Sequence, residues 1–202
     1  MTRTFWHNHV GVVLIGILIL TGCAGWDYQD LTDPSRDMWQ KPQGVIEKLS
    51  ITPGSRVADL GAGTGYFTWH LAKAVGARGT VYAVDINRAS LDMIFKEMVA
   101  RGTPNVRPVH AELHNPKLPE PVDLVFSCDV YHIMNDRVTY FRSLASSLKS
   151  GGRVAILDFH PRGFLSGLFG DRIDKEVVRN EMEVAGYRLL NDYDVVDSQH
   201  FQ

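Results

Sequence analysis

Two acids on either side of a glycine-rich turn are the residues of this 202-residue chain best suited to hold a ligand. Asp59 lies just before the turn Gly61–Gly65, and Asp85 follows 20 residues after Gly65. Glycines let the backbone turn sharply and let a ligand approach without meeting Cβ atoms. The helix start that follows offers unpaired N–H groups. The pattern predicts a ligand bound over the turn.

The spacing of the glycines indicates what kind of ligand this is. Dinucleotide-binding proteins carry G-x-G-x-x-G, whose third glycine allows close packing beneath the pyrophosphate. Here Tyr66 stands in that third place, which favours a ligand without phosphate. Asp85 ends an apolar run, and an ionised carboxylate there can accept hydrogen bonds from both hydroxyls of a ribose. We therefore predict a nucleoside-sized ligand, although Asp85 as a surface or helix-capping acid stays open.

A second group of reactive side chains follows two later apolar runs: Asp129, Tyr131, His132, Asp158 and His160. His132 could serve as a general base or orient an acceptor, or it could pack beneath the edge of the ligand. Imidazoles and carboxylates of this group could also bind a divalent ion. No tight ligand spacing supports a metal site, and we predict none.

The elements that must position these residues alternate between strands and helices, which favours an α/β fold. We predict a Rossmann-like, doubly wound, mostly parallel seven-stranded sheet with a C-terminal antiparallel strand, which the end of the chain at Gln202 could truncate. Asp136 is expected to cap a helix, and Gly102 to end one. The expected strands are 56–60, 80–84, 106–109, 122–127, 154–159, 187–193 and 198–202, and the expected helices are about 45–49, 66–75, 91–99, 138–148 and 175–185.

Over roughly residues 38–193 these motifs resemble the class I S-adenosylmethionine (SAM)-dependent methyltransferases. Asp59–Gly65 is similar to their first motif, and Val84-Asp85 to their ribose-binding acid. Residues 123–132 resemble the fourth-strand motif beside the transferred methyl group. Residues 148–153 resemble the segment before strand five, with Ser150 in place of the usual proline.

The resemblance implies SAM as co-substrate and assigns roles to individual residues. Asp59 would hold the methionine amino group through the turn, and Glu112 would stand near the adenine amine, where Asp or Asn is more usual. The implied cofactor-binding residues are Asp59, Gly61, Ala62, Gly63, Gly65, Asp85, Ile86, Glu112 and Asp129, and the candidate catalytic residues are His132, Asp129 and Tyr131.

The function implied is methyl transfer to a small-molecule or lipid-like acceptor. Methyl transfer from a sulfonium is an in-line displacement, and much of its catalysis can come from positioning. A base is needed only if the acceptor must lose a proton, so the lack of a catalytic triad is no objection. The acceptor and its reacting atom are not determined by the sequence.

Composition sets broad limits. Hydrophobic residues make up 45% and charged residues 22% of the chain, as in an ordinary globular domain. The formal net charge of -2 provides no reason to expect a nucleic-acid partner. The oligomeric state is not determined.

The N-terminus has the pattern of an export signal: a basic start, the apolar run Val10–Leu20, and then Leu-Thr-Gly before Cys23. Its ending resembles the lipobox of bacterial lipoproteins. We therefore expect a signal peptide over 1–22, a tether over 23–42 and the methyltransferase-type domain over 43–202, with a lipidated Cys23 at the membrane of the bacterial cell envelope, facing the periplasm or exterior. An uncleaved anchor, or a start at Met38 that leaves the chain in the cytoplasm, stays open.

Export conflicts with the use of SAM, which is made in the cytoplasm. The rival hypothesis is a membrane-tethered, non-catalytic module that binds SAM or a nucleoside and kept the fold after export. The intact turn argues against complete decay, because no structural need explains three glycines and both acids together.

Overall fold

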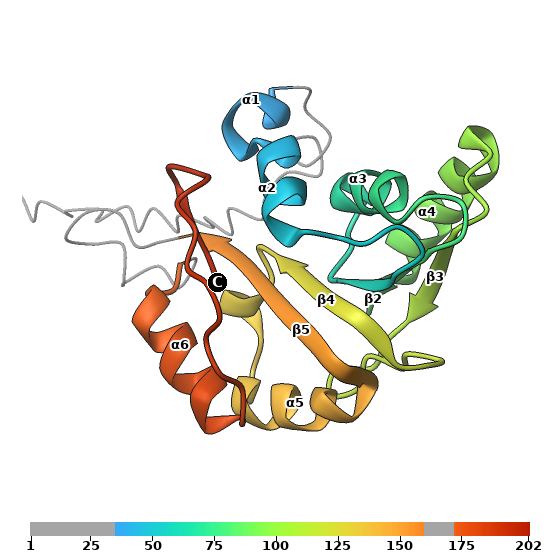
Figure 1. Ribbon diagram of the computed structural model, residues 1–202. Helices are drawn as coiled ribbons and strands as arrows, with labels where there is room; N and C mark the ends of the chain where they lie inside the picture. Colours follow the sequence, from blue (N-terminus) through green and yellow to red (C-terminus); the bar gives the residue numbers. More distant parts are fainter. Residues whose placement is uncertain (1–34, 160–171) are drawn as a thin grey trace, which may run out of the picture.

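A six-stranded sheet forms the centre of the molecule (Figure 1). The computed structural model describes residues 35–159 and 172–202. The strand order is β3-β2-β1-β4-β5-β6, and every neighbouring pair is parallel except β5 and β6. The predicted Rossmann-like class is confirmed. The strands are β1 (Arg56–Leu60), β2 (Thr80–Asp85), β3 (Val106–His110), β4 (Val122–Cys128), β5 (Leu148–Phe159) and β6 (Gln199–Phe201).

Helices cover both faces of this sheet. Helices α2, α3 and α4 lie on one side in Figure 1, and α5 and α6 lie on the other. The apolar residues accordingly form two clusters, one on each face of the sheet. The helices are α1 (Arg36–Gln40), α2 (Pro42–Leu49), α3 (Tyr66–Val75), α4 (Arg88–Arg101), α5 (Arg137–Leu144) and α6 (Lys175–Val184).

The central strands are buried because both of their faces are covered. In β2, Val81 and Ala83 join the cluster beneath α3 and α4, while Tyr82 and Val84 join the cluster above α5. This alternation follows from the two-residue period of a strand. It explains why the strands appear in the sequence as continuous apolar runs.

The strand order creates one crevice at the carboxyl edge of the sheet. Strand β1 lies between β2 and β4, and the connections that leave the carboxyl ends of the neighbouring strands β1 and β4 run to opposite sides, to β2 and to β5. Ligands of open α/β sheets bind at such a switch point. The turn after β1 and the acid that ends β2 meet at this edge.

Three predictions about the elements need correction. Residues 187–192 form no strand, and Tyr193 makes only an isolated bridge to Phe201. The reason is that β6, three residues long, offers no ladder to a further neighbour. Helix α1 lies within the range expected to be a tether. Asp136 adopts a left-handed conformation with φ 49° and makes no side-chain cap, whereas Gly102 ends α4 as predicted.

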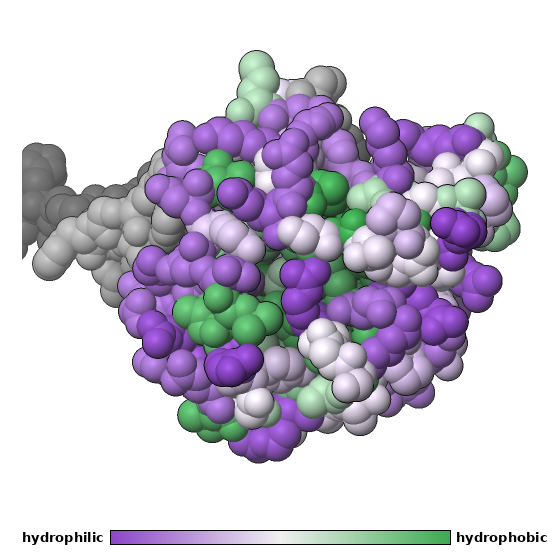
Figure 2. Space-filling view, viewed as in Figure 1, coloured by the Kyte–Doolittle hydropathy of each residue, from purple (hydrophilic) through white to green (hydrophobic). Residues whose placement is uncertain are grey.

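One cavity of the molecule lies away from the crevice. A hollow of about 460 Å³ runs along Gly151–Ile156 of β5, bounded by α6 and the C-terminal segment. Figure 2 shows hydrophobic side chains at the centre of this face, surrounded by hydrophilic ones. None of the predicted site residues lines it.

Within residues 35–159 and 172–202, no helix has the length and apolar character needed to cross a membrane.

Candidate active site

The acid that ends β2 holds the glycine turn. Asp85 Oδ2 accepts a hydrogen bond of 2.8 Å from the backbone N–H of Gly63, and its Oδ1 accepts one of 2.8 Å from Asn87. The N–H groups of Gly61 and Ala62 donate to the carbonyl of Val84 at 2.8 and 3.0 Å. The predicted proximity of Asp85 and the turn is confirmed.

The glycines of the turn lack a side chain for different structural reasons. All have positive φ, of 75° at Gly61, 53° at Gly63 and 89° at Gly65. A Cβ on Gly61 would lie 2.2 Å from a methyl group of Val130, whereas one on Gly63 would meet nothing within 4 Å. Gly61 therefore makes room for the chain's own Val130, and Gly63 is the glycine whose missing side chain leaves open space.

Beside the turn lies a cavity of about 280 Å³ with mostly apolar walls. Its volume is at the lower end of the range of ligand pockets, roughly 300–1,000 Å³, and suits a nucleoside better than a whole SAM molecule. Asp85 lies at its wall, so a ribose bound by Asp85 would place its base inside. The other lining residues are Leu60, Gly61, Val84, Ile86, Ala111, Glu112, Leu113, Val130, Ile133, Met134, Asn135 and Tyr140.

Ile86 and Glu112 lie where the sequence predicted them, at the rim of this cavity. The Ile86 side chain is 58% exposed and forms an apolar edge. The Glu112 carboxylate is 64% exposed and forms an ion pair of 2.7 Å with Lys117. Glu112 can reach a ligand only in competition with Lys117 and water.

Asp59 lies behind the turn rather than in the cavity. It is 3% exposed, and its Oδ2 accepts a hydrogen bond of 2.6 Å from the Thr68 hydroxyl on α3. Burial raises the pKa of Asp59 to about 7, with a further increase from Asp85 and opposition from Thr68 and Arg36. Asp59 therefore changes charge near neutral pH.

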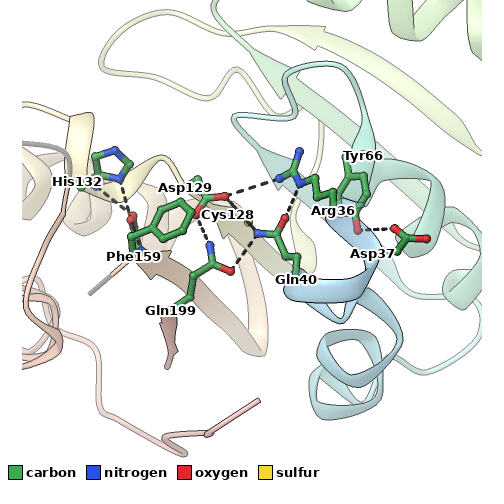
Figure 3. A network of polar contacts seen from close by, with 10 residues as sticks. Arg36, Asp37, Gln40, Tyr66, Cys128, Asp129, His132, Phe159 and Gln199 are labelled. Atoms are coloured by element: carbon green, nitrogen blue, oxygen red, sulfur yellow. Dashed lines mark hydrogen bonds and ion pairs between the residues drawn. The ribbon is translucent and has the colours of Figure 1, made fainter. Parts of the chain in front are cut away.

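A polar network surrounds Asp129 at the end of β4 (Figure 3). Its carboxylate accepts from Gln40 Nε2 at 3.2 Å and from Gln199, and lies 3.6 Å from Arg36 Nη2. Burial, with the nearby Asp158, raises the pKa of Asp129 to about 6, and Arg36 opposes this shift. The network joins α1, β4 and β6 at one point.

Sequence reasoning missed Arg36, Gln40 and Gln199. Arg36 is 6% exposed, and its guanidinium lies 4.0 Å from the centre of the Tyr66 ring, directly after the glycine turn. Gln40 and Gln199 are buried and hydrogen-bonded to each other at 3.0 Å. These residues lie in a polar N-terminal stretch and in a strand at the far end of the chain, so no motif could reveal them.

His132 and Asp158 are brought together as a pair. Asp158 Oδ1 lies 2.7 Å from His132 Nδ1, and Asp158 Oδ2 accepts from the His132 backbone N–H at 3.1 Å. Asp158 is fully buried, and the Phe159 N–H also donates to it at 2.8 Å. In Figure 3, His132 lies on one side of Asp129 and Arg36 on the other.

The structure does not place Tyr131 at the crevice. Its side chain is fully buried in the apolar cluster between the sheet and α5, and its hydroxyl donates to Glu181 Oε2 at 2.9 Å. The short helix η1 (Tyr131–Ile133) turns consecutive side chains in different directions, so that His132 meets Asp158 while Tyr131 points into the core. The expectation that Tyr131 faces the crevice is therefore wrong.

Some predicted residues lie outside the described ranges: Cys23, His160 and the apolar loop 162–170. Among residues 35–159 and 172–202, no three His, Cys, Asp or Glu side chains gather as metal ligands would.

Comparisons with known proteins agree with this geometry. Residues 57–152 match the model of a methyltransferase domain family. The chain is 32% identical to the ubiquinone/menaquinone biosynthesis C-methyltransferase UbiE of Azotobacter vinelandii over 155 residues, covering 74% of this chain and 59% of that protein. It thus spans less than two thirds of that relative's length.

Solved structures show the same fold. A SAM-dependent methyltransferase from Aquifex aeolicus superposes with a TM-score of 0.78 at 25% identity, covering 86% of this chain and 94% of that one. The [4+2]-cyclase SpnF superposes with a TM-score of 0.66 at 21% identity, covering 77% and 60%. The chain therefore carries a methyltransferase domain over residues 57–152, with the fold of the class I SAM-dependent methyltransferases.

Proposed function

We propose that the protein is a SAM-dependent methyltransferase that acts on a small-molecule or lipid-like acceptor. The observation that carries this proposal is the contact between Asp85 and Gly63 beside an open apolar cavity. A nucleoside requires a sugar acceptor, a flat apolar slot and a backbone that a ligand can approach, and this edge of the sheet combines all three.

The nucleoside half of SAM fits the residues present. Asp85 Oδ1 and Oδ2 each accept one backbone hydrogen bond, and a carboxylate has about four acceptor sites, so two remain for the ribose hydroxyls. Gly63 leaves open space beside them. The base would lie against the apolar walls made by Ile86, Leu113 and Val130.

The amino-acid half of SAM requires groups for an ammonium and a carboxylate. Asp59 and Asp129 are buried acids on the far side of the turn, and Arg36 is the buried cation whose charge acts on both. A cation between two acids is complementary to a zwitterion. We propose that Arg36 would hold the carboxylate and that the two acids would face the positive groups.

When bound, SAM supplies an electrophilic methyl group on a cationic sulfur. This chain's part is to position the acceptor and, where needed, to remove its proton. We propose the pair His132 and Asp158 for that second task, because a carboxylate oxygen of Asp158 2.7 Å from Nδ1 favours the tautomer with its proton on Nδ1. The imidazole is then oriented to use Nε2 as the basic atom.

The proposal predicts that the domain binds S-adenosylhomocysteine (SAH), which isothermal calorimetry measures directly. Asp85→Asn keeps the shape of the side chain but removes its charge, and we expect affinity to fall at least tenfold. Asp92→Asn is the matched control, because Asp92 is an exposed acid on α4 that lines no part of the cavity. Absence of SAH binding by the unaltered protein would reject the proposal.

The acceptor is inferred from the relatives. The name of the Azotobacter vinelandii protein describes a C-methyltransferase of quinone biosynthesis, which supports an aromatic, lipid-like acceptor here. Incubation with labelled SAM and reduced quinone-type acceptors, followed by mass spectrometry, tests this class. His132→Gln should lower the rate of transfer to an acceptor that must lose a proton, without changing SAH affinity. Equal rates in both proteins would remove His132 from the chemistry.

The second candidate is a tethered module that binds the nucleoside without transferring methyl groups. The likeness to a [4+2]-cyclase supports only the point that this fold is not tied to methyl transfer. Lipid on Cys23, detected by mass spectrometry of membrane fractions, together with SAH binding and no labelled product from cell extracts, would support it. An unlipidated, active protein would reject it.

A further inference from the structure

The cavity beside the glycine turn contains one buried polar group that the proposed function does not use. Tyr140 is 4% exposed and lines the cavity together with Leu60, Val84 and Ala111. It lies on α5 and packs among residues beneath β1, β2 and β4. A tyrosine in this position adds a phenolic group to a mostly apolar lining.

The hydroxyl of Tyr140 has no hydrogen-bond partner within residues 35–159 and 172–202. The other hydroxyls of the same apolar cluster are paired: Tyr131 donates to Glu181, Tyr187 to the carbonyl of Phe141, and Tyr82 to Glu120. The enclosed polar atoms without a partner belong to other residues, such as Ser127. The oxygen of Tyr140 is not one of these enclosed atoms, and Tyr140 lines the cavity, which makes a ligand in the cavity its candidate partner.

Buried hydroxyls in proteins are usually hydrogen-bonded, because an unpaired polar group away from water is unfavourable. Burial also raises the pKa of Tyr140, so the group stays protonated and can both donate and accept. A ligand that places a nitrogen or an amine beside this oxygen would satisfy it. The apolar walls of the cavity would supply the remaining contacts of a flat aromatic ring in such a ligand.

Tyr140 differs in this respect from Glu112, the residue that the sequence assigned to the base. The Glu112 carboxylate is mostly exposed and paired with Lys117 at 2.7 Å, so water and Lys117 compensate it whether or not a base is present. Tyr140 has neither. A site discriminates strongly where a ligand that lacks the right group leaves a buried polar atom unpaired.

We propose that the hydroxyl of Tyr140 hydrogen-bonds the polar edge of the purine base and determines which base the site accepts. This inference rests on the proposed function, because it requires that a nucleoside occupies the cavity. It assigns the choice of base to α5 rather than to the loop after β3.

The test compares SAH affinities of the unaltered protein and Tyr140→Phe by isothermal calorimetry. This substitution removes only the hydroxyl, and we expect about tenfold weaker binding, the equivalent of one neutral hydrogen bond. Tyr187→Phe is the matched control, since it removes a paired hydroxyl from the same cluster at a residue that does not line the cavity. It should leave SAH affinity unchanged.

A series of SAH analogues locates the contact. Analogues with one ring nitrogen replaced by carbon, and the inosine analogue, change the base edge one atom at a time. We expect at least one of them to bind the unaltered protein and Tyr140→Phe equally well, because its partner atom is missing. Equal SAH affinity of the two proteins, or the same loss for SAH and all analogues, would overturn the inference.

The two hypotheses fail in different ways. If the unaltered protein binds no SAH, the proposed function is rejected and the inference with it. If it binds SAH and Tyr140→Phe binds equally, only the role of Tyr140 is rejected.

Discussion

The backbone N–H of Gly63 and the carboxylate of Asp85 are joined by a hydrogen bond of 2.8 Å. This contact ties the turn after β1 to the end of β2, so the acid that would hold a sugar also fixes the backbone over which the sugar lies. A substitution of Asp85 is therefore expected to loosen the turn as well as to remove a ligand. Preorganisation of this kind lowers the cost of binding.

Alanine substitutions at the glycines of the turn are expected to lower the stability of the protein by different amounts. Gly61→Ala combines an unfavourable positive φ with a contact of 2.2 Å to Val130, and should cost roughly 2–4 kcal/mol of stability. Gly63→Ala meets nothing within 4 Å and should cost only about 1 kcal/mol. Urea unfolding measures both. Val130→Ala should restore part of the loss in Gly61→Ala, and no restoration would contradict the steric explanation.

The buried Asp59 is expected to make the stability of the protein depend on pH. Its pKa is about 7 in the folded protein against 3.8 for a free group, so the folded state binds more protons between these values. Stability is therefore expected to decline as pH rises from about 4 to 7. Asp59→Asn should remove the part of the decline that Asp59 causes and stabilise the protein by up to about 4 kcal/mol at pH 8, with little effect at pH 4. Unfolding at both pH values measures this, and an equal effect at each would contradict the burial argument.

Removal of Arg36 is expected to cost more stability at high pH than at low pH. Arg36→Met leaves the buried Asp129 without its cation, which should cost about 3 kcal/mol at pH 8. At pH 5 the cost should be smaller, because Asp129, with a pKa of about 6, is already largely protonated. Thermal unfolding across this range tests the prediction. Adding Asp129→Asn to Arg36→Met should recover stability at pH 8, and a cost that does not vary with pH would exclude the ion pair as its cause.

Substitution of Tyr131 is expected to lower the stability of the protein without lowering the rate of methyl transfer. Tyr131→Phe removes the hydrogen bond to Glu181 and should cost about 1 kcal/mol, because Arg137 still pairs with that carboxylate at 2.7 Å. The rate of methyl transfer and the affinity for SAH should stay within twofold. A large fall in rate at unchanged stability would return Tyr131 to the active site.

Much of the fold could be predicted because its signals are local. The run before Gly61 predicted β1, and Gly102 marked the end of α4, since burial period and backbone conformation depend on neighbouring residues. The expected strand at 187–193 failed because a strand needs a partner, and β6 is too short to provide one. The predicted orientation of the Tyr131 side chain was wrong because η1 is a short helical turn inside a loop.

The sequence by itself determined the class of fold, the turn over Gly61–Gly65 and the acid at Asp85, because these depend on residue type and spacing along one stretch of chain. Only the tertiary structure decided that Gly61 accommodates Val130, that Arg36 and Gln199 surround Asp129, and that Tyr140 lines the cavity. These contacts join residues far apart in the chain. Their energies depend on burial and mutual distance, quantities that exist only once the sheet has brought its strands together.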